Sequence, residues 1–188
     1  MNVIIFGPPG AGKGTQSKFI SKKYNLFKLS TGDILREQIK QKTDLGIKIS
    51  PIINTGSFVS DEIVSELIEK VIREKKNYNK IIFDGYPRSL TQAKNLDNLL
   101  IKYKQKIGIV LKLSVSLDTI KKRISERRTL ENRPDDNEEI AVKRYETYEK
   151  STEPVIEYYK KLNLLKVING ESSIDQINNE ISDIINLI

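Results

Sequence analysis

Short apolar runs alternate with longer amphipathic stretches along the chain. The runs cover residues 3–6, 26–29, 80–83, 107–113 and 164–168, and they are typical of strands buried on both faces of a parallel sheet. Between them, apolar residues at helical spacing predict helices over 15–24, 30–40, 45–54, 61–75, 90–103, 117–128, 138–162 and 174–188, with an interruption near Pro154. Thr31 or Asp33 is available as the N-cap of the helix at 30–40. This alternation predicts an α/β fold with a central parallel sheet.

The first apolar run leads into a glycine-rich loop and then into a helical pattern. Glycines let backbone N–H groups converge on phosphate oxygens, and a helix N-terminus adds partial positive charge. The spacing Gly7-x4-Gly12-Lys13 matches the phosphate-binding P-loop, but Gly14 replaces the usual hydroxyl residue, so the hydroxyl moves to Thr15. The segment predicts binding of a nucleoside triphosphate by a three-layer α/β sandwich of the P-loop NTPase type. A glycine-rich turn that happens to precede a helix is the alternative.

Asp84 ends the apolar run at residues 80–83. In a parallel sheet this is a carboxyl end, where ligands bind in open α/β folds. A P-loop enzyme needs a carboxylate near the Mg²⁺ that bridges the phosphates, and Asp84 is placed for that role. Taken alone, Asp84 is equally well interpreted as a turn residue.

Composition limits the chemistry that the chain can perform. Its 188 residues include no cysteine and no histidine, which excludes disulfides, a thiolate nucleophile, an imidazole base and a Cys-ligated zinc. Phosphoryl transfer remains compatible, because it depends mainly on positioning and charge neutralisation. No apolar stretch approaches the roughly 18 residues of a membrane span, and no secretory signal is visible. We therefore expect a cytoplasmic protein without a membrane partner, and a monomer because no large exposed apolar face is indicated.

The formal net charge is +7, which is compatible with either a nucleic-acid-binding protein or a site for small anions. The lysines are spread along the chain and mixed with glutamate, and no aromatic-basic platform is present. We therefore expect no nucleic-acid partner. Six arginines fall in segments predicted to surround the carboxyl edge of the sheet, at positions 36, 88, 123, 127, 133 and 144. Such a set suits two phosphate chains held in one cleft, because guanidinium groups neutralise phosphate oxygens bidentately.

Several segments together resemble the adenylate kinase family of the short-lid type, over nearly the whole chain. They are residues 7–15, LSTGDILR at 29–36, TGSFV at 55–59, FDGYPR at 83–88, residues 127–136 and TEP at 152–154. The resemblance implies the reversible reaction of Mg²⁺-ATP with AMP to give two ADP. It also implies a core of residues 1–29, 60–125 and 137–188, a helical NMP-binding insertion at 30–59 and a short lid at 126–136.

The resemblance further implies roles for individual residues. ATP would be bound by Gly10, Ala11, Gly12, Lys13, Gly14, Thr15, Arg123, Arg127, Gly170 and Ser172, and AMP by Thr31, Arg36, Ser57, Phe58, Val59, Gly85, Tyr86, Pro87, Arg88, Gln92, Arg133 and Arg144. The catalytic set would be Lys13, Asp84, Arg88, Arg123, Arg127, Arg133 and Arg144. Asp84 would orient Mg²⁺ through water, so no residue is expected to bind a metal directly and no zinc is expected. Asp135 and Asp136 would hinge the lid, and the Tyr86–Pro87 peptide bond would be cis.

The choice of acceptor rests on Thr31 and Gln92, which can both hydrogen-bond the edge of an adenine base. A site built around polar groups rejects a base that leaves them unpaired. AMP is therefore expected as the acceptor, and a UMP/CMP kinase is the alternative. A nucleotide switch or binding module is a further alternative, but it has no use for a second phosphate clamp.

Overall fold

The computed structural model describes residues 1–55, 57, 59–131 and 138–188. The sheet has five parallel strands in the order β2-β3-β1-β4-β5. The strands are β1 (Asn2–Phe6), β2 (Phe27–Ser30), β3 (Ile81–Asp84), β4 (Ile107–Ser114) and β5 (Leu165–Asn169). The predicted α/β class is confirmed, and each predicted strand exists with its ends shifted by a residue or so.

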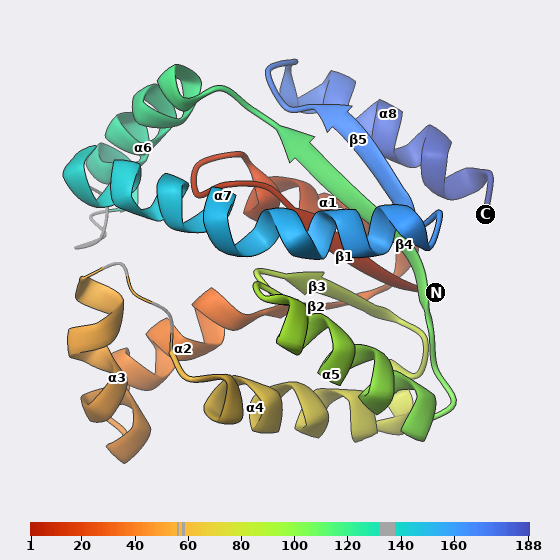
Figure 1. The fold of residues 1–188 in the computed structure, drawn as a ribbon. Coiled ribbons are helices and arrows are strands. Elements are labelled where there is room, and N and C mark those ends of the chain that lie inside the picture. The colour runs from red at the N-terminus through yellow and green to blue at the C-terminus, as the bar shows by residue number, and fades with distance from the viewer. Residues whose placement is uncertain (56, 58, 132–137) are drawn as a thin grey trace.

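Helices cover both faces of the sheet (Figure 1). One face carries α1 (Lys13–Tyr24) and α8 (Ile174–Asn186), and the other carries α4 (Asp61–Arg73), α5 (Leu90–Lys102) and α7 (Glu138–Lys161). Beyond the carboxyl ends of the strands lie α2 (Thr31–Lys40), α3 (Asp44–Asn54) and α6 (Leu117–Glu131), and a 3₁₀ turn, η1 (Lys75–Asn77), follows α4. Among the described residues, no helix is both long and apolar enough to span a lipid bilayer.

Two helix predictions need correction. The interruption expected near Pro154 is absent, because α7 continues through this residue to Lys161. Val155 and Ile156 are buried against the sheet, and this packing compensates for the hydrogen bond that proline cannot donate. The N-cap of α2 is Ser30, whose hydroxyl accepts from the backbone N–H of Asp33 at 3.2 Å, and not Thr31 or Asp33. Thr31 is the first residue of the helix itself.

The core lies in two layers, one on each face of the sheet. Successive residues of β1 supply both, because Val3 and Ile5 pack toward α1 and α8, while Ile4 and Phe6 pack toward α4, α5 and α7. All four are at most 4% exposed, which explains why this strand is an unbroken apolar run.

Buried amides join three strands at the amino edge of the sheet. Asn2 accepts from the backbone N–H of Ile81 at 3.0 Å and donates to Gln105 at 3.2 Å. Gln105 also accepts from the backbone N–H of Asn79 at 3.0 Å. These hydrogen bonds hold the amino ends of the strands together. The predicted site lies at the opposite edge of the sheet, where the loops and insertions follow the carboxyl ends of the strands.

Helices α2 and α3 form a closely packed pair at the carboxyl edge. A Cβ atom added to Gly46 would lie 2.0 Å from the carbonyl oxygen of Gln38, so only glycine allows this approach. Thr43 caps α3 by accepting from the backbone N–H of Gly46 at 3.0 Å. The pair lies within the segment 30–59 that was predicted as a helical insertion.

Candidate active site

The glycine loop connects β1 to the N-terminus of α1. Gly10 and Gly12 have φ angles of 85° and 90°, which favour glycine because side chains rarely tolerate them. Gly12 is the N-cap of α1 and has no side chain with which to bond the first turn. The loop therefore presents backbone N–H groups and the positive end of a helix at one point, which is a suitable arrangement for an anion.

The ammonium group of Lys13 lies back against this loop. It donates to the carbonyl oxygens of Gly7 at 2.6 Å and Pro8 at 2.9 Å. Burial lowers the pKa of Lys13 to about 7; Asp84 opposes the shift, and the positive charges of Arg88, Arg144 and Arg127 add to it. A phosphate beside Lys13 would reverse this balance by favouring the charged form.

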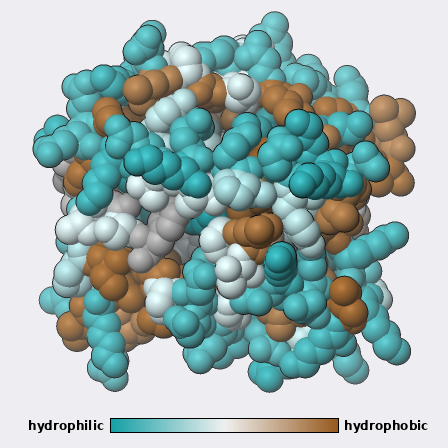
Figure 2. Space-filling model, viewed as in Figure 1, coloured by the Kyte–Doolittle hydropathy of each residue, from teal (hydrophilic) through white to brown (hydrophobic). Residues whose placement is uncertain are grey.

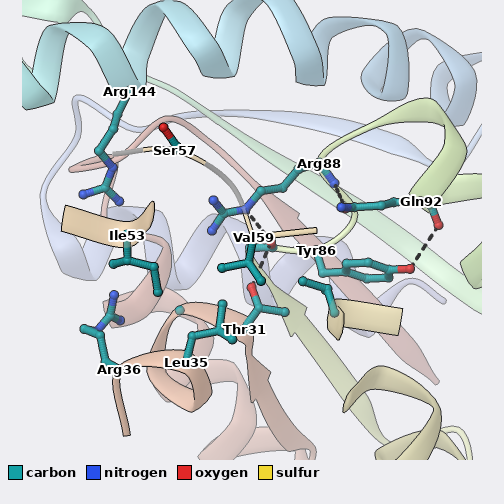
Figure 3. Close-up of a pocket in the computed structure, with 13 residues that line it drawn as sticks. Thr31, Leu35, Arg36, Ile53, Ser57, Val59, Tyr86, Arg88, Gln92 and Arg144 are labelled. Atoms are coloured by element: carbon teal, nitrogen blue, oxygen red, sulfur yellow. Dashed lines mark hydrogen bonds between the residues drawn. The ribbon is translucent and has the colours of Figure 1, made fainter. Parts of the chain in front are cut away.

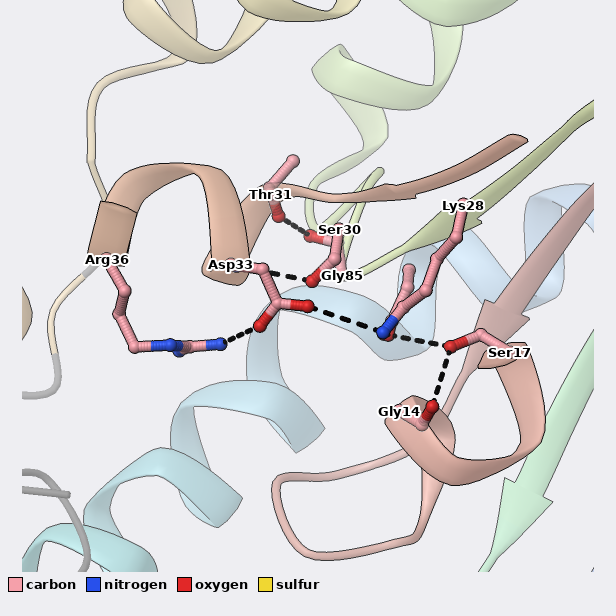
Figure 4. A network of polar contacts seen from close by, with 9 residues as sticks. Gly14, Ser17, Lys28, Ser30, Thr31, Asp33, Arg36 and Gly85 are labelled. Carbon is pink, nitrogen blue, oxygen red and sulfur yellow. Dashed lines mark hydrogen bonds and ion pairs between the residues drawn. The ribbon is translucent and has the colours of Figure 1, made fainter. Parts of the chain in front are cut away.

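Asp84 joins a chain of polar contacts between α1 and α2, of which Figure 4 labels Ser17, Lys28, Asp33 and Arg36. Its carboxylate accepts from the hydroxyl of Ser17 at 3.1 Å and lies 3.8 Å from the ammonium of Lys28. The same ammonium is 3.3 Å from Asp33, which pairs in turn with Arg36 at 2.5 Å. Sequence reasoning placed Asp84 correctly at the carboxyl edge but missed Ser17, Lys28 and the role of Asp33.

A cavity of about 70 Å³ lies between α2, the end of α3 and the turn after β3 (Figure 3). Its polar lining includes predicted AMP-site residues: Thr31, Arg36, Ser57, Gly85, Arg88, Gln92 and Arg144. Val59 and Tyr86, also predicted, line it as well, together with three apolar residues that sequence reasoning missed: Leu35, Ile53 and Val64. Leu35 follows Thr31 by one helical turn, and this spacing was the signal available in the sequence.

Hydrogen bonds fix the polar groups of this cavity. Thr31 donates its hydroxyl to the carbonyl of Gly85 at 3.0 Å, and the Arg88 guanidinium donates to the same oxygen at 2.7 Å. A Cβ atom at Gly85 would lie 3.0 Å from each of these two side chains. The amide of Gln92 accepts from the backbone N–H of Arg88 at 2.7 Å and donates to Asp61 at 2.5 Å. The Tyr86–Pro87 bond is cis, as predicted.

A second cavity, of about 60 Å³, shares Gly85, Arg88 and Arg144 with the first and is also lined by residues of the glycine loop. Lys13, Arg88 and Arg144 all line it, and the two arginines line the first cavity as well. Burial, together with the neighbouring positive charges of Arg144 and Arg36, lowers the pKa of Arg88 to about 10, and Asp84 opposes the shift. Figure 3 shows Arg88 and Arg144 at the first cavity. Lys13, from a third segment of the chain, lines the second cavity together with these two arginines.

The loop after β5 meets the start of α6. Arg123 donates to the carbonyl of Gly170 at 2.9 Å. Glu171, which sequence reasoning missed, accepts from the backbone N–H of Ser116 at 2.7 Å and the hydroxyl of Thr119 at 2.6 Å. These hydrogen bonds, first among them that from Thr119, lower the pKa of Glu171 to about 2. Ser172 lies in the same loop and donates its backbone N–H to Asn169 at 3.4 Å.

Comparison with known proteins shows the family of the chain. A family model described as adenylate kinase matches residues 5–164. An adenylate kinase of Pelagibacter ubique is 46% identical over 211 residues, covering 98% of this chain and 99% of the relative. Adenylate kinases of Fusobacterium nucleatum and of Caulobacter sp. strain K31 are 40% and 41% identical, covering 98% and 94% of this chain and the same shares of the relatives. The chain belongs to the adenylate kinase family.

Most residues that the adenylate kinase resemblance implied lie at the two cavities or at the glycine loop. Arg123, Gly170 and Ser172 lie apart from the cavities, at the α6 end of the site. Phe58, Arg133, Asp135 and Asp136 lie outside the described residues. Their assigned roles, like the division into core, insertion and lid, stay predictions.

Proposed function

We propose that this member of the adenylate kinase family catalyses reversible phosphoryl transfer from Mg²⁺-ATP to AMP, giving two ADP and balancing adenine nucleotides. The observation that carries the proposal is the junction of the two cavities. Lys13 comes from the glycine loop, Arg88 from the turn after β3 and Arg144 from α7, and all three line the second cavity. An ATP triphosphate on the loop and an AMP phosphate in the first cavity would meet at these cations.

The chemistry needs no general base. An acceptor phosphate is already ionised, so it can attack the γ-phosphorus directly. The transferring group carries charge on its oxygens, and catalysis depends on holding the two phosphates in line and neutralising that charge. Lys13 would hold the outer phosphates of ATP, Arg36 and Arg88 the phosphate of AMP, and Arg144 the group in transit. Arg123 and Arg127 would reach ATP from α6, and Arg133 would add to the clamp.

The first cavity supports adenine as the acceptor base. The hydroxyl of Thr31 donates its hydrogen to the carbonyl of Gly85. The hydroxyl oxygen therefore stays available to accept a hydrogen bond from the amino group of adenine. The side-chain oxygen of Gln92 accepts from the backbone N–H of Arg88, and one of its amino hydrogens is donated to Asp61. The second amino hydrogen is left to donate to a ring nitrogen. Guanine would present the opposite pattern. The backbone around Ser57, Phe58 and Val59 would cover the base.

Magnesium would bind at this site together with the nucleotide. Among the described residues, no group of three or more acidic, histidine or cysteine side chains could hold a metal ion. Mg²⁺ commonly keeps several waters and binds one or two carboxylates together with substrate phosphates. Asp84, positioned by Ser17, would hold such a water, and the bound ion would neutralise phosphate charge during transfer.

The remaining assignments complete the proposal. Residues 30–59 would close over AMP and residues 126–136 over ATP, whose adenine would lie beside Gly170 and Ser172. We propose a cytoplasmic monomer without a nucleic-acid partner. In support of a monomer, Figure 2 shows hydrophilic residues over most of the visible face, with apolar residues in separate patches.

The test is product formation from Mg²⁺-ATP with AMP, CMP, UMP or no acceptor. We expect rapid ADP formation with AMP alone, and a loss of at least about 10³-fold in Arg88→Ala. Arg88→Lys keeps the positive charge but cannot hydrogen-bond a phosphate bidentately, so it should recover only part of the rate. Better rates with CMP or UMP would favour a pyrimidine nucleotide kinase. ATP consumption that is indifferent to any acceptor would favour a nucleotide switch.

A further inference from the structure

Lys28 places a positive charge between two carboxylates at the carboxyl edge of the sheet. Its ammonium lies 3.3 Å from Asp33 and 3.8 Å from Asp84 (Figure 4). The Asp84 side chain is only 9% exposed, and that of Lys28 is 25% exposed. The pairing therefore lies in a partly desolvated region, where charge interactions are stronger than in bulk water.

The arrangement follows from the pairing of β2 with β3. Ser30 stands opposite Asp84 in the parallel register, and Lys28 lies two residues earlier on the same face of β2. Asp33 lies in the first turn of α2, where the hydroxyl of Ser30 holds its backbone. Three neighbouring elements thus bring the two carboxylates to one ammonium.

Lys28 is not placed as a phosphate ligand. It is absent from the lining of both cavities, where Lys13, Arg36, Arg88 and Arg144 lie. Its nearest charged partners are the two carboxylates. A cation in this position lowers the negative potential that a second cation would experience near Asp84.

We propose that Lys28 is a resident counter-ion of Asp33 and Asp84, which weakens the hold of the enzyme–nucleotide complex on Mg²⁺. The inference rests on the proposed function, in which Mg²⁺ arrives with ATP and is held through Asp84. The weaker hold has a chemical use, because product release requires the metal to leave with its nucleotide. Without Lys28, Asp33 would keep its ion pair with Arg36, but Asp84 would lose the ammonium beside it. The Asp84 carboxylate would then attract the hydrated ion more strongly.

The experiment measures how strongly metal and nucleotide binding are coupled. The dissociation constant of a non-hydrolysable ATP analogue is measured by calorimetry, once with excess EDTA and once with saturating Mg²⁺. The dissociation constant in EDTA divided by the dissociation constant in Mg²⁺ gives the factor by which the metal strengthens nucleotide binding. This ratio reports the coupling free energy, which is reciprocal between the two ligands. We expect Lys28→Met to raise this ratio about tenfold, equivalent to about 1.4 kcal/mol, whereas Lys28→Arg should leave it within about twofold.

Lys102→Met is the matched control. Its ammonium pairs with Glu69 at 2.9 Å on the surface of α5, so the variant changes net charge equally without touching the site and should leave the ratio unchanged. An unchanged ratio in Lys28→Met would overturn the proposal. Weaker binding of the metal-free analogue with a lower ratio would also overturn it, because Lys28 would then be a phosphate ligand.

These outcomes are separable from failure of the proposed function. If wild type formed no ADP from ATP and AMP, the kinase assignment would fail whatever the calorimetry showed. If wild type were an active kinase and the ratio did not respond to Lys28→Met, only the inference about Lys28 would fail.

Discussion

The side-chain oxygen of Gln92 accepts a hydrogen bond from the backbone N–H of Arg88 at 2.7 Å. One amide thereby links the part of the first cavity proposed to select the base to the turn that carries a phosphate-binding guanidinium. The amino group of the same amide donates to Asp61 at the start of α4. Base selection and phosphate binding in this enzyme therefore share one buried side chain.

Substitution of Gln92 should impair AMP use far more than ATP use. Gln92→Met keeps a similar volume but loses both hydrogen bonds and leaves the N–H of Arg88 unpaired. We expect the KM for AMP to rise at least tenfold, with a lower kcat and a KM for ATP within about twofold, in steady-state kinetics. Gln105→Met removes a comparable buried amide at the amino edge. It should lower the Tm without changing the KM for AMP, and equal kinetic effects in both variants would contradict the assignment.

Nucleotide binding at pH 8 should take up a proton at Lys13. The pKa of Lys13 is about 7 in the free protein because of burial, so at pH 8 the side chain is mostly neutral. The phosphate oxygens of bound ATP raise the pKa of Lys13, because they favour its charged form. The neutral amine therefore takes up a proton when ATP binds. Calorimetry of ATP binding in two buffers with different ionisation enthalpies should give close to one proton taken up at pH 8. The uptake should vanish below about pH 6, where the lysine is already charged.

Lys13→Arg is the control for this proton. A guanidinium remains charged at pH 8, so the variant should bind ATP without the uptake. Equal uptake in the variant and the wild type would assign the proton to another group.

Removing the hydroxyl of Tyr148 should not destabilise the protein. This side chain is 8% exposed, and within the described chain its hydroxyl has no hydrogen-bond partner. Because an unpaired buried hydroxyl is unfavourable, Tyr148→Phe should leave the Tm unchanged or raise it by about 2–4 °C. Tyr158→Phe, on the same helix, removes a 2.6 Å bond to Asp97 and should lower the Tm by a similar amount. A larger drop in Tm for Tyr148→Phe than for Tyr158→Phe would refute the prediction.

Gly46→Ala should separate α3 from α2. The added methyl group would meet the backbone carbonyl of Gln38, which cannot move without displacing the helix. We expect a loss of about 1–3 kcal/mol in the free energy of unfolding and a higher KM for AMP, measured by urea denaturation and kinetics. Ile47→Ala, at an exposed position of the same helix, should change neither quantity greatly. Unaltered AMP kinetics in Gly46→Ala would argue that this helix pair does not position the acceptor.

Local signals in the sequence predicted the parts of the fold that depend on neighbouring residues. The run at residues 3–6 and the glycines after it identify β1 and the glycine loop because burial and backbone geometry act within that stretch. Pro154 shows where such reasoning fails. The local rule predicts a break, but burial of Val155 and Ile156 against the sheet overrides it.

The site was predictable where a motif names its residues, and not where strand register brings them together. Lys13, Asp84 and Arg88 stand in recognisable local patterns. Lys28 and Ser17 meet Asp84 only because β2 pairs with β3 and α1 packs beside it, and no spacing along the chain reports this. Glu171 reaches Ser116 across 55 residues for the same reason.

Both chain ends lie on the side of the sheet away from α2, α3 and α6 (Figure 1). A linker or surface attachment at either end would therefore leave the two cavities and the glycine loop facing solution. The enzyme could be immobilised on a solid support through either end and still exchange ATP, ADP and AMP with the surrounding medium. That orientation makes the fold suitable as a nucleotide-recycling component beside other ATP-consuming enzymes on a common scaffold.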